Sequence, residues 1–385
     1  MSATAPPTLR PESVQEAAQL MRELGQAGRP VAIQGAQTKQ GWIGGETEVT
    51  LATEALDHVL EHNEGDFTAV LQAGVPLAAA QAQFAKAGQM LALDPPLSGD
   101  GGEPRATVGG VMATADSGPL RHRYGGVRDL VLGVTVVLSD GTVAKAGGRV
   151  IKNVAGYDLG KLFAGSYGTL GLIATVVVRL HPLPERTATV HARSEDAAAL
   201  ARAAGHLVAL SLEADCLDVH WEGGRGELLV RFSGFSAAER ADQAASRLAE
   251  LGQREVMVTD EDEETWARQR ARQREPGGAV IKVAAVTGRT LEILRATQGV
   301  DARVVSRPGL GLAWVALGAG DDLPERVERL RAALPQAALT ALDGAASLPG
   351  HWPVPAAAAL AVMERIKARF DPAHICRPGA FVGGI

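Results

Sequence analysis

Cysteine and aromatic residues are scarce in this sequence, and several kinds of protein can be excluded from what is missing. The 385 residues contain only two cysteines, Cys216 and Cys376, which stand far apart and form no CxxC pair, iron–sulfur run or zinc ribbon. No apolar run reaches the roughly 18 residues that a membrane-spanning helix needs. The first residues, Met1 to Pro7, carry neither a basic start nor an apolar segment. We expect a cytoplasmic protein, with any membrane association made through partners.

An excess of positive charge is also missing. The formal net charge is -6, and no cluster of Lys and Arg contradicts it, which argues against general binding of nucleic acid. No strand is followed by a GxGxxG motif, which argues against a standard Rossmann dinucleotide site. The hydrophobic fraction of 46% with 21% charged residues is typical of a globular protein, and the length favours two domains.

Alternating helical and strand patterns fill the first half of the chain. A capping box at Ser13 and Glu16 opens a helix over about 13–25, and a strand at 31–33 follows. Residues 98–126 are predicted to form a long functional loop. His181 to Pro184 mark a boundary, after which the pattern indicates a second unit. The last helical stripe, 360–370, is predicted to return to the first domain. We therefore expect domains at 1–185, joined by 362–385, and at 186–361.

Glycine-rich segments are the candidate ligand-binding loops. Gly35-Ala36-Gln37-Thr38 follows a predicted strand, so its backbone N–H groups could face a diphosphate, although a plain strand-ending turn would have the same sequence. The small side chains of residues 106–118 would leave room for a large flat ligand. Further glycines in 147–159 and 163–173 gather near the start of one strand.

Histidines and charged runs offer weaker signals. His58 and His62 have the i, i+4 spacing of a helical metal site, but no third ligand is evident and we expect no metal. No catalytic residue can be assigned; His122, between Arg121 and Arg123, is the weak candidate because an adjacent cationic loop could stabilise a negative charge that develops on a bound ligand. The acidic run 260–264 is predicted to begin a helix, with a partner-docking helix as the alternative.

Several separated motifs occur together in one order. They are Asp94-Pro95-Pro96, Thr107-Val108-Gly109-Gly110, Ser117-Gly118-Pro119, Arg121 with Tyr124-Gly125, Val127-Arg128-Asp129-Leu130, and the run from Lys152 to Leu159. Over about residues 10–185 the chain thereby resembles the FAD-binding domain of the vanillyl-alcohol oxidase and p-cresol methylhydroxylase (PCMH) group. Within this group it is most similar to the FAD-binding E subunits of glycolate oxidases.

The resemblance implies a fold and a cofactor. The fold would be α+β, with a two-lobed PCMH-type FAD-binding domain and a smaller α/β cap domain. The loop 35–38 would meet the FAD diphosphate, the loops at 95–96 and 107–110 would line the flavin, and Ile173 would lie near the adenine. Gln37 stands where many relatives carry a linking His, so noncovalent FAD is expected. The expected cofactor-binding residues are Gly35, Ala36, Gln37, Thr38, Pro95, Pro96, Thr107, Val108, Gly109, Gly110, Thr114, Ser117, Gly118, Tyr124 and Ile173.

The resemblance also implies partners, namely a second FAD-binding, catalytic subunit and an iron–sulfur subunit of a glycolate oxidase that acts on a glycolate-like 2-hydroxy acid. Two features depart from relatives that oxidise D-2-hydroxy acids. The metal-binding motif GHxGDGNxH is missing, and the C-terminal Asn-Pro-Gly-Arg is replaced by Arg377-Pro378-Gly379-Ala380. A self-sufficient FAD-dependent 2-hydroxy-acid dehydrogenase and a scaffold that keeps the fold without FAD remain the alternatives.

Overall fold

Helix α1 (Val14–Ala27) opens the first lobe, and local signals explain both of its ends. Ser13 Oγ accepts a hydrogen bond from the backbone N–H of Glu16 at 3.1 Å, which satisfies one of the free donors of the first turn. Gly28, at φ 63°, ends the helix. Its apolar face packs on a small parallel sheet in the order β1-β3-β2. These strands are β1 (Thr8–Leu9), β2 (Val31–Gln34) and β3 (Val49–Ala52). The helix and strand expected here are confirmed.

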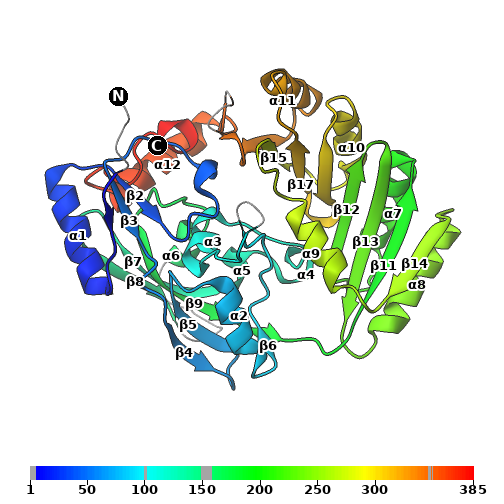
Figure 1. The fold of residues 1–385 in the computed structure, drawn as a ribbon, viewed down its shortest axis with the longest axis horizontal. Coiled ribbons are helices and arrows are strands. Elements are labelled where there is room, and N and C mark those ends of the chain that lie inside the picture. Colours follow the sequence, from blue (N-terminus) through cyan, green and yellow to red (C-terminus); the bar gives the residue numbers. More distant parts are fainter. Residues whose placement is uncertain (1–5, 99–101, 149–157, 346–347, 349) are drawn as a thin grey trace.

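The structure is a computed structural model that describes residues 6–98, 102–148, 158–345, 348 and 350–385. Its second lobe is built on an antiparallel sheet in the order β4-β5-β9-β7-β8. Short helices lie between this sheet and the rest of the molecule (Figure 1). The strands are β4 (Val59–Asn63), β5 (Thr68–Gln72), β7 (Val131–Val137), β8 (Val143–Gly147) and β9 (Leu172–Arg179), and the helices are α2 (Leu77–Ala85), α3 (Val108–Thr114), α4 (Arg121–Tyr124), α5 (Val127–Leu130) and α6 (Leu159–Phe163).

The second half of the chain forms an antiparallel sheet in the order β14-β11-β13-β12-β16-β17-β15-β18. Helices α7, α8, α10 and α11 cover one face, where Trp221, Phe232 and Ile281 belong to the apolar core. Helix α9 lies on the other face, toward the first half (Figure 1). The strands are β11 (Thr187–Ser194), β12 (Cys216–Glu222), β13 (Arg225–Ser233), β14 (Glu255–Thr259), β15 (Ala279–Ala284), β16 (Arg303–Arg307), β17 (Leu312–Leu317) and β18 (Ala338–Ala341). The helices are α7 (Ala197–Ala209), α8 (Ala237–Glu250), α9 (Glu263–Ala271), α10 (Thr290–Gln298) and α11 (Leu323–Ala333).

Helix α12 (Ala357–Phe370) brings the chain back to the first half. Lys367 Nζ donates to the carbonyl oxygens of Thr169 and Cys376, both at 2.7 Å. Cys376 then lies parallel to Val31, so the tail extends the first small sheet. The predicted return of the last helix is confirmed.

Two local expectations were wrong. The segment with His58 and His62 is not helical, because β4 pairs with β5 and forms the edge of the second sheet. His62 Nε2 lies 3.0 Å from Gln89 Oε1, which gives this ring a structural partner. The expected loop over 98–126 contains α3 and α4. No helix among the described residues is long and apolar enough to cross a membrane.

Candidate functional site

The loop after β2 and the start of α3 form the two sides of one cavity of about 610 Å³. Thr107 Oγ1 caps α3 by accepting from the N–H of Gly110 at 3.1 Å, which fixes the first turn of the helix at the cavity wall. A Cβ on Gly35 would lie 2.3 Å from that same Oγ1, so the close approach of the two segments requires glycine at 35. Gln37 takes the left-handed conformation, with φ 58°.

A second cavity of about 360 Å³ continues from the first, since both are lined by Ile33, Gln34, Gly35, Gly110 and Ala113. It adds Gly109 and Ile173 to the lining. We call the two together the cofactor groove. Of the residues expected to bind the cofactor, the groove is lined by Gly35, Ala36, Gln37, Thr38, Thr107, Gly109, Gly110, Thr114 and Ile173.

Gly109 is required because its backbone lies in close contact with Ala73. A Cβ there would lie 2.6 Å from the Cβ of Ala73 and 2.9 Å from its carbonyl oxygen. The N–H of Gly109 donates to that oxygen at 2.8 Å. The missing side chain therefore lets α3 pack on the end of β5 and holds the helix start at the groove.

Arg377 is a groove residue that the sequence analysis did not assign. It lines the cavity beside the loop 35–40, and its Nη1 donates to Gly44 O at 3.0 Å. Burial lowers the pKa of this guanidinium, with no carboxylate of the described residues to offset the effect. The sequence signal that could have identified Arg377 was the altered C-terminal motif, Arg377-Pro378-Gly379-Ala380, in which the arginine precedes the Pro-Gly pair. A cation beside exposed backbone N–H groups suits a diphosphate.

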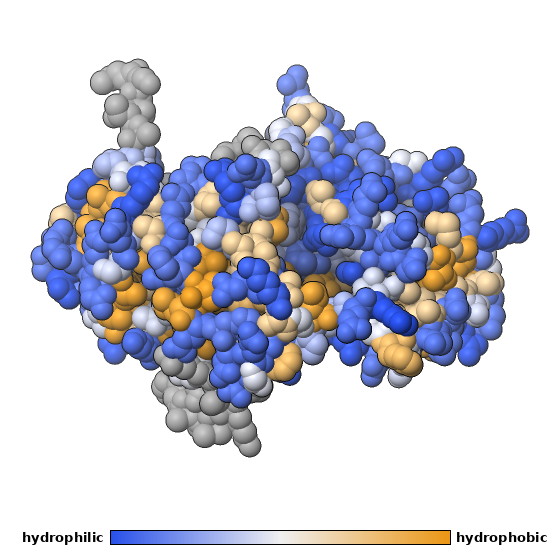
Figure 2. Space-filling view, turned by 60° about the horizontal axis from the view of Figure 1, so that its bottom comes forward, coloured by the Kyte–Doolittle hydropathy of each residue, from blue (hydrophilic) through white to orange (hydrophobic). Residues whose placement is uncertain are grey.

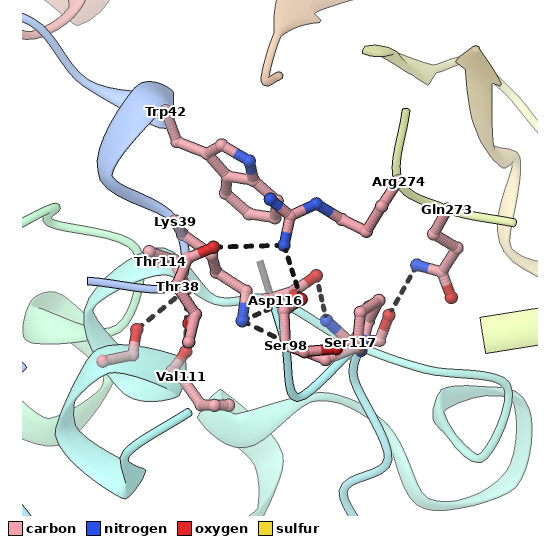
Figure 3. A network of polar contacts seen from close by, with 12 residues as sticks. Thr38, Lys39, Trp42, Ser98, Val111, Thr114, Asp116, Ser117, Gln273 and Arg274 are labelled. Carbon is pink, nitrogen blue, oxygen red and sulfur yellow. Dashed lines mark hydrogen bonds and ion pairs between the residues drawn. The ribbon is translucent and has the colours of Figure 1, made fainter. Parts of the chain in front are cut away.

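Behind the loop, Lys39 and Asp116 form a buried ion pair, Nζ to Oδ2, at 3.3 Å (Figure 3). Lys39 Nζ also donates to the carbonyl oxygen of Pro96 at 3.1 Å. Burial is the largest influence on the pKa of Lys39 and lowers it, while Asp116 opposes the shift. This lysine thus joins three of the predicted loops, 35–38, 95–96 and 107–118.

Arg274 connects the same loop to the second half of the molecule. Its Nη1 donates to Thr38 O at 3.2 Å and to Ser98 O at 3.1 Å, and its Nε lies 2.7 Å from Asp343 Oδ2. Its guanidinium also stacks over the ring of Trp42, with 5.5 Å to the centroid (Figure 3). The arginine ties the first loop to the segment after β18.

The cap sheet presents further buried charges toward Ser117. Arg307 is fully buried; its Nη1 donates to Ser117 O at 3.2 Å, and its Nε lies 3.4 Å from Asp218 Oδ1. Gln273 Nε2 donates to the same carbonyl at 3.1 Å. On β15, which β17 separates from the strand of Arg307, burial first and then Arg121 lower the pKa of Lys282 to about 8. Sequence patterns missed these residues because nothing local marks which face of a strand they occupy.

The remaining predicted residues lie outside the groove lining. Val108 is part of the apolar core of the second lobe. Gly118 packs against Asp94, since a Cβ there would lie 1.8 Å from Asp94 O. Tyr124 packs edge-on against His181. His122 faces the cap, 2.9 Å from the position a Cβ on Gly309 would take, and burial lowers its pKa. Pro96 and Ser117 contribute the carbonyl oxygens that accept from Lys39, Arg307 and Gln273, and Pro95 directly precedes Pro96. The run from Lys152 to Tyr157 lies outside the described residues.

Comparison with known proteins agrees with this geometry. Residues 6–147 match the family model described as an FAD binding domain. Over 96% of the chain the fold matches a solved alkyldihydroxyacetonephosphate synthase structure with a TM-score of 0.70 at 16% identity, covering 75% of that chain. At that identity the likeness concerns the fold.

Curated relatives cover part of the chain. Glycolate oxidase subunit GlcE of Escherichia coli is 31% identical over 227 residues, which is 57% of this chain and 64% of the relative. Glycolate oxidase subunit GlcD of Bacillus subtilis is 31% identical over 207 residues, 53% of this chain and 43% of the relative. Mitochondrial D-2-hydroxyglutarate dehydrogenase of Bos taurus is 37% identical over 180 residues, 46% of this chain and 32% of the relative. This chain thus spans less than two thirds of each of these relatives.

Proposed function

We propose that this chain works as an FAD-dependent oxidoreductase subunit of a glycolate oxidase complex. The match of residues 6–147 to an FAD binding domain, the similarity to glycolate oxidase subunits and the shared fold support the proposal. The observation that carries the proposal is the cofactor groove, where the loop 35–38, the start of α3 and Arg377 converge. FAD, when bound, supplies two-electron oxidation and reduction.

The groove residues suit the parts of FAD. Arg377 and the backbone N–H groups of the loop 35–38 would hold the diphosphate, because a buried cation and free backbone N–H groups both favour phosphate. Ile173 and the glycines around it leave room for the adenine. The flavin would lie toward Thr107, Pro96 and the cap, where Lys39, Asp116 and Arg274 fix the surrounding loops. We propose that 1–185 with 362–385 hold the cofactor and that 186–361 act as the cap.

A specific observation favours the second candidate, a self-sufficient 2-hydroxy-acid dehydrogenase. Burial first, then Arg121 and Arg307, lower the pKa of Lys282, while Asp116 opposes the shift. These cations therefore lie near one another, and a substrate carboxylate could be oriented there. Against it, no group of three or more metal-ligating side chains occurs in the described parts of the chain. Oxidation of a hydroxy acid also needs a base beside the substrate hydroxyl.

The test compares the chain alone with the complex. The flavin content of the purified chain is measured by absorption, and turnover of glycolate with a dye acceptor is then measured for three samples. These are this chain, the glycolate oxidase catalytic and iron–sulfur subunits of the same genome, and the mixture of all three. We expect bound FAD in the chain and turnover only in the mixture. Full turnover by the chain alone would support the dehydrogenase instead, and a colourless chain that takes up no FAD would support a scaffold.

A further inference from the structure

A larger groove of about 2050 Å³ lies on another side of the molecule, between α2 and strand β6 (Gln89–Met90) on one side and the cap on the other. It shares no lining residue with the cofactor groove. Figure 2 brings this lower side forward and shows hydrophobic surface reaching the line where the two halves meet. We call it the lower groove.

The two walls of the lower groove differ in chemistry. The wall from the first half is largely apolar and includes Leu77, Met90, Leu93, Leu97 and Leu120. The opposite wall and rim, formed by the cap and by the adjoining Glu185, are acidic. The carboxylates are those of Glu185, Asp215, Asp260, Glu261, Asp262, Glu263 and Glu264.

The cations of the lower groove pair with only part of its carboxylates. Arg231 Nε lies 3.2 Å from Asp262 Oδ2, and Arg270 Nη1 lies 3.8 Å from Asp94 Oδ2. Both arginines are therefore already paired, and the exposed carboxylates of the rim keep their negative charge, namely those of Asp260, Glu261, Glu263 and Glu264. A ligand that carries positive charge would be attracted.

One oxygen of a buried carboxylate in the lower groove also lacks a hydrogen-bond donor. The side chain of Asp215 is only 3% exposed, and its Oδ1 lies 3.3 Å from Arg123 Nε. The other oxygen, Oδ2, accepts no hydrogen bond within the described parts of the chain. A buried acceptor without a donor is costly, so a donor brought by a ligand would be favoured here. Burial raises the pKa of this carboxyl, while a hydrogen bond with Ser233 and the nearby arginines, Arg123 first, oppose the shift.

The two unlike walls of the lower groove decide between two kinds of occupant. A small polycation would satisfy the acidic rim and leave the apolar wall uncovered. An extended peptide can cover both walls, because its side chains alternate between two faces. We propose that the lower groove binds an extended segment of a partner protein in which Lys or Arg alternates with apolar residues. That the partner is an oxidase subunit rests on the proposed function.

The position of the lower groove gives this binding a use. Pro95 lines it and also belongs to the loop whose next residue, Pro96, is held by Lys39. A segment bound there would lie beside the loop expected to line the flavin. Docking would thus bring the partner close to the redox site.

The test uses a labelled ten-residue peptide of alternating lysine and valine, with binding followed by fluorescence anisotropy. The protein is the full chain loaded with FAD. The groove variant combines Glu185→Lys and Glu261→Lys, two exposed residues of the groove lining. The matched control combines Glu239→Lys and Asp242→Lys on the exposed face of α8, with the same change in net charge. Both pairs are at the surface, so both variants should fold.

We expect the groove variant to bind the peptide at least about tenfold more weakly and the control to change less than about twofold. A peptide of lysine and serine should bind clearly more weakly, because it leaves the apolar wall uncovered. Equal weakening in both variants would overturn the proposal, as would equal binding of the lysine–serine peptide. Spermine competing as well as the lysine–valine peptide would point to a small polycation instead and would also overturn it.

A second arm separates this proposal from the proposed function. The wild-type chain and the groove variant are each mixed with the catalytic or the iron–sulfur subunit, and complexes are sought by size-exclusion chromatography. Association lost in the groove variant but kept in the control supports docking of the subunit at the lower groove. Association kept in both variants overturns that docking. No association even with the wild-type chain refutes the proposed partnership, whereas the peptide result still decides the chemistry of the groove.

Discussion

Lys39 and Asp116 lie 3.3 Å apart, with 6% and 2% of their side chains exposed. One follows the loop after β2 and the other follows α3, so the pair joins the two segments that form the cofactor groove. On the surface, in water, such an ion pair contributes little to stability. In the interior, removing one charge leaves the other buried without compensation, which is strongly destabilising.

Removing either charge of this pair should destabilise the folded protein, and removing both should cost less stability than the two single losses added together. We expect Lys39→Met and Asp116→Asn each to lower the free energy of unfolding by about 3 kcal/mol, since each leaves an uncompensated buried group. The double variant should lose clearly less than the sum. Urea unfolding of the four proteins gives the coupling energy, and strict additivity would show that the two charges act independently.

Arg377 should contribute directly to FAD affinity. A charge-assisted hydrogen bond contributes about 1.5–3 kcal/mol, so Arg377→Gln should raise the dissociation constant of FAD about 10- to 100-fold. Arg377→Lys should recover part of this loss, because it keeps the charge without the planar fork. Titration of FAD-free protein by fluorescence measures the affinity, with Arg365→Gln on the exposed side of α12 as the control. An unchanged affinity in Arg377→Gln would remove this residue from the site.

Two glycines near the first loop provide a matched comparison. A Cβ on Gly35 meets Thr107 Oγ1 at 2.3 Å, whereas one on Gly41 has no atom within 4 Å. Gly35→Val should displace the cap of α3 and reduce FAD binding at least about tenfold, because the cap alone contributes about 1 kcal/mol and the cavity is also narrowed. Gly41→Val should bind FAD normally. Bound FAD per folded protein is measured for both, and equal occupancy would contradict the role of Gly35.

The cofactor should be released by acid. Gln37 has no group that forms the usual covalent bond to flavin, so acid precipitation should leave all the yellow colour in the supernatant. Colour that stays with the pelleted protein would show a covalent link elsewhere.

Asp94 should make stability depend on pH. Burial raises its pKa from 3.8 to about 6, against the attraction of Arg270. Since the folded state holds this proton more tightly than the unfolded state, its stabilising contribution is complete below about pH 4 and is lost as the pH rises through 6. Relative to Asp94→Asn, the wild type should lose roughly 2–3 kcal/mol of unfolding free energy between pH 4 and 7. Urea unfolding across this range tests it, with the exposed Asp321→Asn as control. A constant difference between wild type and Asp94→Asn would refute the shift.

Local signals predicted the first helix and the first loop, since Ser13 caps its own helix and Gly35 directly follows its strand. Helix α3 was missed because Gly109 and Gly110 are poor helix formers, and the helix is held by contacts with Ala73. The pair Arg307 and Asp218 joins strands far apart in the sequence. No local pattern could have shown that contact. At His58 and His62 the i, i+4 spacing misled, because the backbone pairing of β4 with β5, and not the histidine spacing, determines the structure there.

The pairing of Val31 with Cys376 has a consequence for the order of events during synthesis. The N–H of Val31 donates to Ile375 O at 2.7 Å, and Arg377, which follows, lines the cofactor groove. A nascent chain therefore cannot complete the groove until residues 375–377 have left the ribosome, although the loop 35–38 emerges early. FAD should be taken up after translation and not during it. Until then the apolar face of α1 and the first sheet lack their final strand and would need protection by chaperones.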